Sequence, residues 1–334
     1  MTINRIEREK IYESYFSKRA KRTVFSQVPL PQISSAQVLI ETHYAALNRA
    51  DLMQRAGDYP PPEGAPEWMG LEISGIVCKI GDAAKKNSGL AVGDRVCALL
   101  GGGGYAEYAA VDYPMVMKVP DCLSLAQASA IPEGYATAYL NLFTEGKLQK
   151  NETVLVHAGA SGVGIAVQQI AKAYGAKVFA TVRSDEKALR IKKFGADQII
   201  NSQTTNMITF FEQHPVDLVI DCVGGNLMGQ CFEKLNRYGR WIMIAALGGD
   251  LTQINLKQVY KKGLRLIGST LRSRPNEIKA QILNSLQSEI FPYFENESIR
   301  PEIFQILNWE NAEEAHRLMQ KNQNTGKIIL KIKA

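Results

Sequence analysis

The chain has 334 residues, of which 46% are hydrophobic and 22% are charged, and its formal net charge is +6. This length suffices for two domains with sizeable cores, and the composition is typical of a soluble globular enzyme. No apolar run reaches the roughly 18–20 residues of a membrane-spanning helix, and the small, dispersed basic excess does not favour a nucleic-acid partner.

Five cysteines, at positions 78, 97, 122, 222 and 231, form neither a C-x-x-C pair nor a metal-ligand spacing. Such an odd, scattered set is typical of reduced thiols. The N-terminal residues include acidic side chains and no apolar signal segment, so we expect a cytoplasmic protein.

The first third of the chain has a β-like pattern after an ambiguous start. Residues 1–22 interleave apolar and charged side chains, which fits an amphipathic helix or a short irregular strand pair, and we interpret them as a peripheral segment. Short strands broken by Gly and Pro turns then predict a compact, barrel-like β lobe. The expected strands are Val38–Tyr44, Ile73–Ile80, Arg95–Leu100 and Tyr105–Val111, with a helix at Leu47–Arg55.

After Asn151 strands alternate with helices, which predicts an α/β fold with a doubly wound parallel sheet. Its expected strands are Val154–His157, Lys177–Val182, Gln198–Ile200, Val216–Asp221, Arg240–Ile244 and Leu264–Gly268. Beyond Pro275 the pattern changes to two helices and a final strand at Lys327–Lys331. We expect this tail to fold back onto the β lobe.

A small-residue turn joins the first sheet strand to a long apolar helix. Small residues let the backbone turn sharply and approach a pyrophosphate, and the helix N-terminus offers N–H groups and a positive dipole end to that anion. An ordinary strand–helix turn is the alternative interpretation. The candidate pyrophosphate-binding residues are Ala158, Gly159, Ser161, Gly162, Val163 and Gly164, which contain an A-x-x-S-x-x-G pattern.

The end of the second sheet strand favours NADP(H) over NAD(H). Arg183, Ser184 and Lys187 follow Val182, where an NAD-binding protein normally places a carboxylate for the ribose hydroxyl. Cations here would pair with a 2′-phosphate. Asp185 lies nearby, but its position fits the first turn of the next helix, and a solvated helix face is the alternative interpretation for the two cations.

Several motifs together resemble the zinc-free quinone oxidoreductases, the branch of the medium-chain dehydrogenase/reductase superfamily that includes zeta-crystallin. The motifs are Asn48–Arg55 with Tyr59–Pro62, Gly70–Gly75, Gly93–Val96, Ile131–Glu133, His157–Gly164, Asp221–Gly225, Leu271–Arg274 and Gly326–Leu330. The resemblance implies a GroES-like substrate lobe of residues 1–128 and 275–334 beside a Rossmann NADP-binding domain of residues 129–274. It also implies a homodimer or homotetramer.

The resemblance implies two residues that line the catalytic cleft. The phenol of Tyr59 would hydrogen-bond a quinone oxygen, and Asn48 would fix the nicotinamide or the acceptor. From sequence alone, Tyr59 is equally a loop aromatic and Asn48 a helix cap. Further positions where relatives approach the cofactor are Thr137, Val223, Leu247, Thr270, Leu271, Arg272 and Asn324, of which Val223 and Leu247 are equally interpreted as core residues.

The chain also departs from its family in ways that bear on function. Leu71 stands where zinc-bearing relatives have a ligating His, their first zinc Cys is replaced near Asn48, and their four-cysteine loop is absent, so we expect no zinc. Ser202 replaces a Tyr that contacts the adenosine phosphate, which weakens one cofactor contact. Residues 1–22 lack the usual opening strand.

The expected function is an NADPH-dependent quinone reductase that acts on a small-molecule acceptor. Reduction of an activated C=C bond would use the same cleft. A third possibility is an NADPH-binding sensor or RNA-binding protein with little turnover, although no aromatic–basic RNA-binding pattern is present.

Overall fold

The computed structural model describes residues 9–14 and 23–333, with side chains from Phe25 onward. The chain divides into two compact units. Unit 1 consists of residues 1–133 and 272–334, and unit 2 of residues 134–271.

Unit 2 contains a six-stranded parallel sheet with the order β10-β9-β8-β11-β12-β13. All six expected strands form, and the doubly wound fold is confirmed. Because the strand order reverses between β8 and β11, a crevice is expected beyond the carboxyl ends of these two strands. The strands are β8 Thr153–Val156, β9 Lys177–Val182, β10 Gln198–Asn201, β11 Leu218–Asp221, β12 Arg240–Met243 and β13 Arg265–Gly268.

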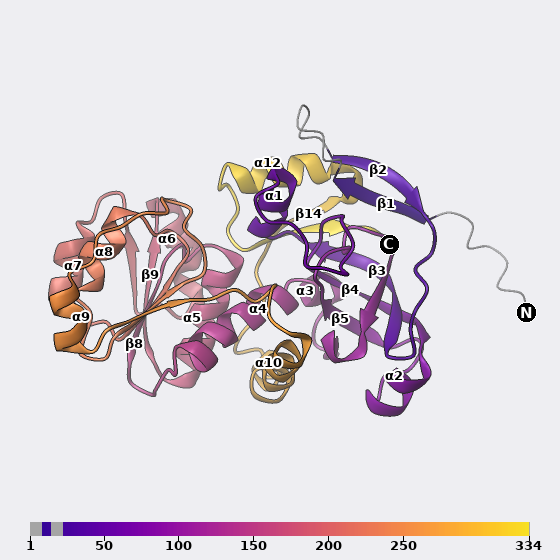
Figure 1. Ribbon diagram of the computed structural model, residues 1–334, viewed down its shortest axis with the longest axis horizontal. Helices are drawn as coiled ribbons and strands as arrows, with labels where there is room; N and C mark the ends of the chain where they lie inside the picture. Colours follow the sequence, from indigo (N-terminus) through magenta and orange to yellow (C-terminus); the bar gives the residue numbers. More distant parts are fainter. Residues whose placement is uncertain (1–8, 15–22, 334) are drawn as a thin grey trace, which may run out of the picture. The chain divides into compact units, whose positions relative to one another are not determined.

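Helices connect these strands and cover both faces of the sheet, with α5 on one side and α7–α9 on the other (Figure 1). The helix α4, Pro132–Tyr139, continues into a π-helical turn at Leu140–Glu145. The others are α5 Gly162–Tyr174, α6 Asp185–Ile191 with the 3-10 turn Lys192–Phe194, α7 Met207–Gln213, α8 Asn226–Phe232 and α9 Leu256–Lys262.

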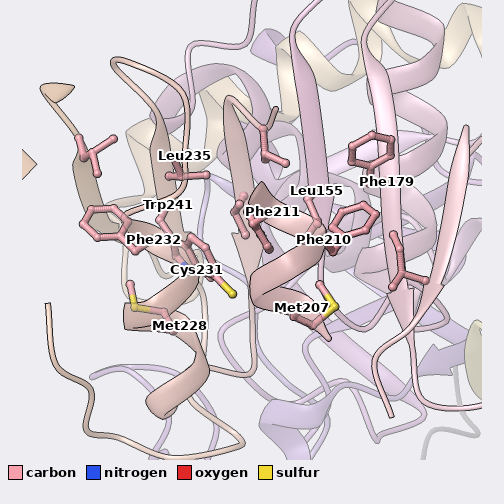
Figure 2. Packing of buried hydrophobic residues seen from close by; sticks show 14 residues of the cluster. Leu155, Phe179, Met207, Phe210, Phe211, Met228, Cys231, Phe232, Leu235 and Trp241 are labelled. Atoms are coloured by element: carbon pink, nitrogen blue, oxygen red, sulfur yellow. The ribbon is translucent and has the colours of Figure 1, made fainter. Parts of the chain in front are cut away.

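The core on one side of this sheet is rich in aromatic side chains. Figure 2 shows Phe210 and Phe211 of α7 and Phe232 of α8 gathered around the strands. Trp241 of β12 is 1% exposed and stacks on Phe211 with 5.8 Å between ring centroids. Burying rings of this size supplies a large share of the hydrophobic stabilisation and fixes the strand ends that carry the turns described below.

Unit 1 contains a seven-stranded sheet that joins both ends of the chain. Its order is β14-β15-β3-β4-β5-β7, and β6 pairs with β3. The C-terminal β15 is antiparallel to β3, so the tail contributes a strand to the β lobe. The strands are β3 Gln37–Ala46, β4 Glu72–Ile80, β5 Arg95–Leu99, β6 Tyr108–Asp112, β7 Val116–Lys118, β14 Ile303–Asn308 and β15 Lys327–Lys331.

Six helices belong to unit 1 in the described part of the chain. They are α1 Arg49–Ala56, α2 Asp82–Asn87, α3 Leu125–Ala128, α10 Asn276–Glu289, α11 Phe291–Glu295 and α12 Ala312–Gln320, with 3-10 turns at Tyr113–Met115 and Trp309–Asn311.

The N-terminal segment forms a strand pair where it is described. β1, Glu9–Ser14, is antiparallel to β2, Thr23–Val28. Residues 9–14 form a strand and not a helix, but their partner strand lies beyond the 1–22 segment for which a strand pair was one of the two interpretations. Residues 1–8 and 15–22 lie outside the described residues.

Candidate cofactor and acceptor sites

The turn between β8 and α5 has the backbone geometry of a phosphate cradle. Ala158 adopts a left-handed conformation with φ of 52°, which turns the chain sharply after the strand. The N–H of Gly159 donates to the Thr181 carbonyl at 2.7 Å, and the hydroxyl of Ser161 accepts from the Gly164 N–H at 3.0 Å as the helix cap. Gly162 and Val163 begin the helix, so their N–H groups have no intrahelical partner and can serve an anion.

Two glycines of this turn are required by close packing. A Cβ added at Gly164 would lie 2.5 Å from the Ala158 carbonyl oxygen, and one at Gly159 would lie 2.8 Å from the Ala180 Cβ. The buried Gln168 side chain ties the turn together by donating to the carbonyls of Gly159 and Gly164 at 2.7 and 2.9 Å. The turn is therefore rigid and free of side-chain bulk, and its geometry fits the pyrophosphate of a dinucleotide.

The cationic cluster follows β9 directly. Arg183 is exposed, and Ser184 caps α6 by accepting from the backbone N–H of Lys187 at 3.3 Å. Asp185 occupies the first turn of α6, as expected, and its carboxylate accepts from the Asn201 side chain at 2.9 Å. The Asp185 carboxylate is therefore held by the Asn201 amide, while the Arg183 side chain stays at the surface.

Ser202 lies beside this cluster but its hydroxyl is already committed. Both its N–H and its hydroxyl donate to the Val182 carbonyl, at 2.8 and 3.1 Å. The Ser202 side chain thus links the end of β9 to the loop after β10, and its oxygen retains only acceptor capacity.

Two apolar residues beyond the sheet strands are exposed. Val223 is 39% exposed after β11 and Leu247 is 55% exposed after β12, so neither is a core residue. The buried carboxylate of Asp221 holds the first of these turns by accepting from the N–H groups of Val223 at 2.6 Å and Gly224 at 3.2 Å. Exposed apolar side chains beyond the carboxyl ends of these strands can pack against a flat ring system.

The remaining cofactor candidates divide between the two units. Thr137 on α4 is 9% exposed, Thr270 is exposed, and Leu271 is 4% exposed. In unit 1, Asn324 is half-buried and its side chain donates to the Gly326 carbonyl at 2.7 Å. Arg272 contacts the loop that carries Tyr59 and is described with that loop below.

In unit 1, a buried ion pair holds Asn48. The ammonium of Lys327, which is 5% exposed, contacts the carboxylate of Glu72, which is fully buried. Lys327 Nζ also donates to Asn48 Oδ1 at 2.6 Å, and Asn48 Nδ2 donates to Glu72 Oε1 at 3.0 Å. Both polar ends of the Asn48 side chain are therefore engaged within unit 1, and its amide is fixed by long-range partners.

The helix that follows Asn48 begins with a second buried carboxylate. Asp51 accepts from the backbone N–H of Asn48 at 2.7 Å and from that of Gly70 at 3.1 Å. Burial raises its pKa to about 6, although these hydrogen bonds act in the opposite direction.

A directed hydrogen-bond chain runs from Asp51 to α12. The hydroxyl of Tyr105 donates to Asp51 Oδ2 at 3.2 Å and lies 3.3 Å from His316 Nε2. Arg55 Nη1 lies 3.4 Å from His316 Nδ1, which makes Nδ1 the acceptor and Nε2 the protonated nitrogen. Burial, with the neighbouring Arg55 charge, lowers the pKa of His316 to about 4 and keeps the imidazole neutral. This series of hydrogen bonds fixes α1 against α12, and the sequence did not predict it.

Tyr59 is held by a buried arginine. The Arg272 guanidinium is 4% exposed and lies 5.1 Å from the centroid of the Tyr59 ring. Its Nη1 donates to the Tyr59 carbonyl at 3.2 Å, Nε to the Gly101 carbonyl at 2.8 Å, and Nη2 to Gln54 Oε1 at 2.6 Å. All three guanidinium nitrogens of Arg272 thus donate hydrogen bonds, and these bonds fix the loop that carries Tyr59.

The Tyr59 side chain is half-buried, and no described residue hydrogen-bonds its hydroxyl. Partial burial, together with the nearby Glu133 charge, raises the pKa of the phenol, so it stays protonated over the physiological range. A protonated phenol on a fixed loop is a hydrogen-bond donor for a ligand oxygen.

Within residues 9–14 and 23–333, no group of three or more His, Cys, Asp and Glu side chains is arranged to hold a metal ion. Leu71 is 1% exposed beside Glu72, whose carboxylate is occupied by Lys327. In the same part of the chain, no helix is both long and apolar enough to cross a membrane.

Comparison with known proteins places both units in one family. Residues 34–121 match the family model "Alcohol dehydrogenase GroES-like domain" and residues 162–288 match "Zinc-binding dehydrogenase". A quinone oxidoreductase from Mus musculus is 31% identical over 311 residues, covering 91% of this chain and 91% of the relative. The solved quinone oxidoreductase from Coxiella burnetii is 27% identical with a TM-score of 0.78, covering 98% of this chain and all of that one.

A mycobacterial protein solved with NADPH shares the fold at a TM-score of 0.84 and 24% identity, covering 98% of this chain and all of that one. The long match to the mouse enzyme and the two family models together define the relationship. The chain belongs to the medium-chain dehydrogenase/reductase family of nicotinamide-dependent oxidoreductases, in the branch of the quinone oxidoreductases.

Proposed function

We propose that this protein is an NADPH-dependent quinone reductase that uses neither metal nor flavin. The observation that carries the proposal is the Tyr59 hydroxyl, a protonated donor on a loop fixed by Arg272 and without a hydrogen-bond partner among the described residues. The 31% identical mouse relative is named as a quinone oxidoreductase, which supports the same acceptor class.

The cradle residues and the exposed apolar residues would hold the cofactor, and a bound nicotinamide supplies the hydride. The helix N-terminus at Ser161 would bind the pyrophosphate, and Arg183, Ser184 and Lys187 would bind the 2′-phosphate. The residues proposed to contact the rest of the cofactor are Thr137, Ser202, Val223, Leu247, Thr270, Leu271 and Asn324.

The chain's own chemistry at the acceptor is hydrogen bonding. A quinone oxygen gains negative charge as it is reduced, and a donor at that oxygen stabilises the charged state more than the neutral one. In this proposal Tyr59 is that donor. Asn48, whose amide is held by Lys327 and Glu72, acts as a positioning residue that sets the start of α1.

The test is steady-state turnover with a panel of acceptors. Purified protein is mixed with NADPH and a small quinone, with NADPH and an α,β-unsaturated aldehyde, and with NADPH alone, and each series is repeated with NADH. Faster oxidation of NADPH with the quinone supports the proposal. Preferential turnover of the unsaturated aldehyde would favour a C=C reductase, and cofactor binding without turnover would favour a sensor.

Zinc and assembly are tested on the same preparation. Leu71 in place of a ligating His and the absence of the cysteine spacings predict activity that survives chelation. Stoichiometric zinc that is lost together with activity would contradict this. We also propose a homodimer or homotetramer, which light scattering of the active protein would measure directly.

A further inference from the structure

The helix α5 carries a fully buried amide side chain. Gln168 is 0% exposed, on a helix whose other buried residues include Ile165 and Ile170. Its Nε2 uses both N–H donors, on the carbonyls of Gly159 and Gly164 at 2.7 and 2.9 Å. Its Oε1 is buried and has no hydrogen-bond partner among the described residues. An unpaired buried oxygen is unfavourable, so packing alone does not account for an amide at this position.

The bond to Gly159 is the one that reaches outside the helix. Gly164 lies four positions before Gln168, where its carbonyl is an ordinary acceptor within α5. Gly159 lies nine positions before Gln168, in the turn between β8 and α5. A Cβ added at Gly159 would lie 3.3 Å from Gln168 Nε2, so the amide is packed directly against this residue. Gln168 therefore fixes the direction of the Gly159 carbonyl from inside unit 2.

The direction of this carbonyl sets the direction of the next N–H. The peptide bond between Gly159 and Ala160 is trans, so its C=O and N–H point in opposite directions. The Gly159 carbonyl faces Gln168, and the Ala160 N–H consequently points away from it. The N–H groups of Gly159 and Ser161, on either side, donate to backbone carbonyls at 2.7 and 2.8 Å. No hydrogen bond joins the Ala160 N–H to another described residue.

We propose that Gln168 is a positioning residue for the dinucleotide pyrophosphate, and that its hold on the Gly159 carbonyl adds the Ala160 N–H to the donors of the cradle. This inference rests on the cofactor binding in the proposed function. Gly162 and Val163 supply the other N–H groups, at the start of α5. A carbonyl oxygen turned toward a diphosphate would repel it, whereas an N–H in its place stabilises the negative charge.

The first test compares two ligands that share the adenosine 2′-phosphate end of the cofactor. NADPH contains the pyrophosphate, and adenosine 2′-phosphate does not. Gln168→Met keeps the approximate length of the side chain and removes both donors, so the Gly159 carbonyl is no longer held. Because one hydrogen bond to a charged group is lost, the Kd of NADPH should rise about tenfold or more. The Kd of adenosine 2′-phosphate should stay almost as before, and calorimetric titration of the cofactor-free protein measures both.

The matched control is Gln169→Met, the same substitution at the next position of α5. Gln169 is 7% exposed, and its Oε1 accepts from the hydroxyl of Tyr135 on α4 at 2.6 Å. This variant should leave the ratio of the two dissociation constants unchanged, even where it lowers the free energy of unfolding. A purely structural role for Gln168 would weaken both ligands alike, and that result would overturn the inference.

The second test uses the unaltered protein and reads the N–H itself. Alanine amides are labelled with nitrogen-15, and the Ala160 resonance is identified by its absence in Ala160→Gly. Its proton resonance should move downfield as NADPH is added, because the N–H then donates to a phosphate oxygen, and it should stay in place with adenosine 2′-phosphate. An Ala160 resonance that ignores NADPH would overturn the inference, whatever the Gln168 variant does.

Failure of the inference and failure of the proposed function give different results. If Gln168→Met binds NADPH as tightly as the unaltered protein while quinones are reduced, the inference is wrong and the proposed function stands. If NADPH binds and no quinone is reduced, the proposed function is wrong, and the two titrations still decide the role of Gln168. A protein that binds neither NADPH nor NADH would overturn both.

Discussion

In unit 2, the proposed cradle for the cofactor is made of backbone and small residues: two glycines whose Cβ positions are blocked, a left-handed Ala158, and a helix cap at Ser161. In unit 1, the corresponding features are ionisable side chains withdrawn from water, with Lys327 paired to Glu72 and Arg272 spread over three acceptors. The pyrophosphate of a dinucleotide is constant, and rigid N–H groups suffice to bind it. An acceptor that changes charge needs groups whose charge and hydrogen bonding respond, and those are found in unit 1.

This comparison predicts that the two units respond to different kinds of substitution. Shape changes should damage the pyrophosphate turn of unit 2, whereas changes of charge or hydrogen bonding should damage unit 1 and the cationic cluster after β9. Four variants test this, in order of decreasing expected effect.

Lys327→Met should have the largest effect, on stability. It leaves the fully buried Glu72 without its cation, and breaking a buried pair in this way costs about 3–5 kcal/mol. The measurement is the free energy of unfolding in urea. Lys333→Met breaks an exposed pair with Glu41 and should cost about 1 kcal/mol or less. Equal losses of unfolding free energy in the two variants would mean that the buried Lys327–Glu72 pair stabilises the protein no more than the exposed pair does.

Gly164→Ala should weaken cofactor binding through shape alone. Its new Cβ would lie 2.5 Å from the Ala158 carbonyl oxygen, so the cradle must shift. Overpacking of this kind costs about 1–3 kcal/mol, which corresponds to about a 5- to 150-fold rise in the dissociation constant of NADPH. Gly268→Ala, where an added Cβ meets nothing within 4 Å, is the control in a fluorescence titration. An unchanged Kd for NADPH in Gly164→Ala would show that cofactor binding does not depend on the present backbone conformation of this turn.

Lys187→Ala should separate the two cofactors. A hydrogen bond to a charged group contributes about 1.5–3 kcal/mol, so the variant should bind NADPH about tenfold or more weakly and NADH almost as before. The charge-matched control is Lys192→Ala, at an exposed position of the 3-10 turn after α6. If affinity for both cofactors falls equally, Lys187 does not recognise the 2′-phosphate.

Tyr59→Phe should have the smallest effect and should act on rate. The ring, and with it the packing on Arg272, is retained while the hydroxyl donor is lost. A quinone is already electrophilic, so we expect kcat to fall about 3- to 30-fold, less than for removal of a typical oxyanion donor. The dissociation constant of NADPH should not change. A loss confined to cofactor affinity would make Tyr59 a wall of the cofactor pocket.

The buried network of Asp51, Tyr105 and His316 shows why part of unit 1 escaped sequence analysis. A lone Tyr in a glycine-rich stretch and a lone His in an amphipathic helix carry no local signal of pairing. Tyr105 and His316 are 211 positions apart in the chain, and only the packing of α12 near α1 brings them together. The same holds for the contacts of Arg272 with Tyr59, which are separated by 213 positions.

The sequence by itself determined the sheet strands of unit 2, the turn with its glycines, and the family, because strand periodicity and small-residue requirements are local properties of the chain. The exposure of Val223 and Leu247 was decided by the tertiary structure, since an apolar residue after a strand can turn inward or outward. The tertiary structure also decided which charges are buried together. Lys327 meets Glu72 across 255 positions because β15 pairs with β3, and β3 pairs with β4. Strand pairing at such separations depends on the whole fold. The pairing of the charged side chains that these strands carry therefore depends on the whole fold as well.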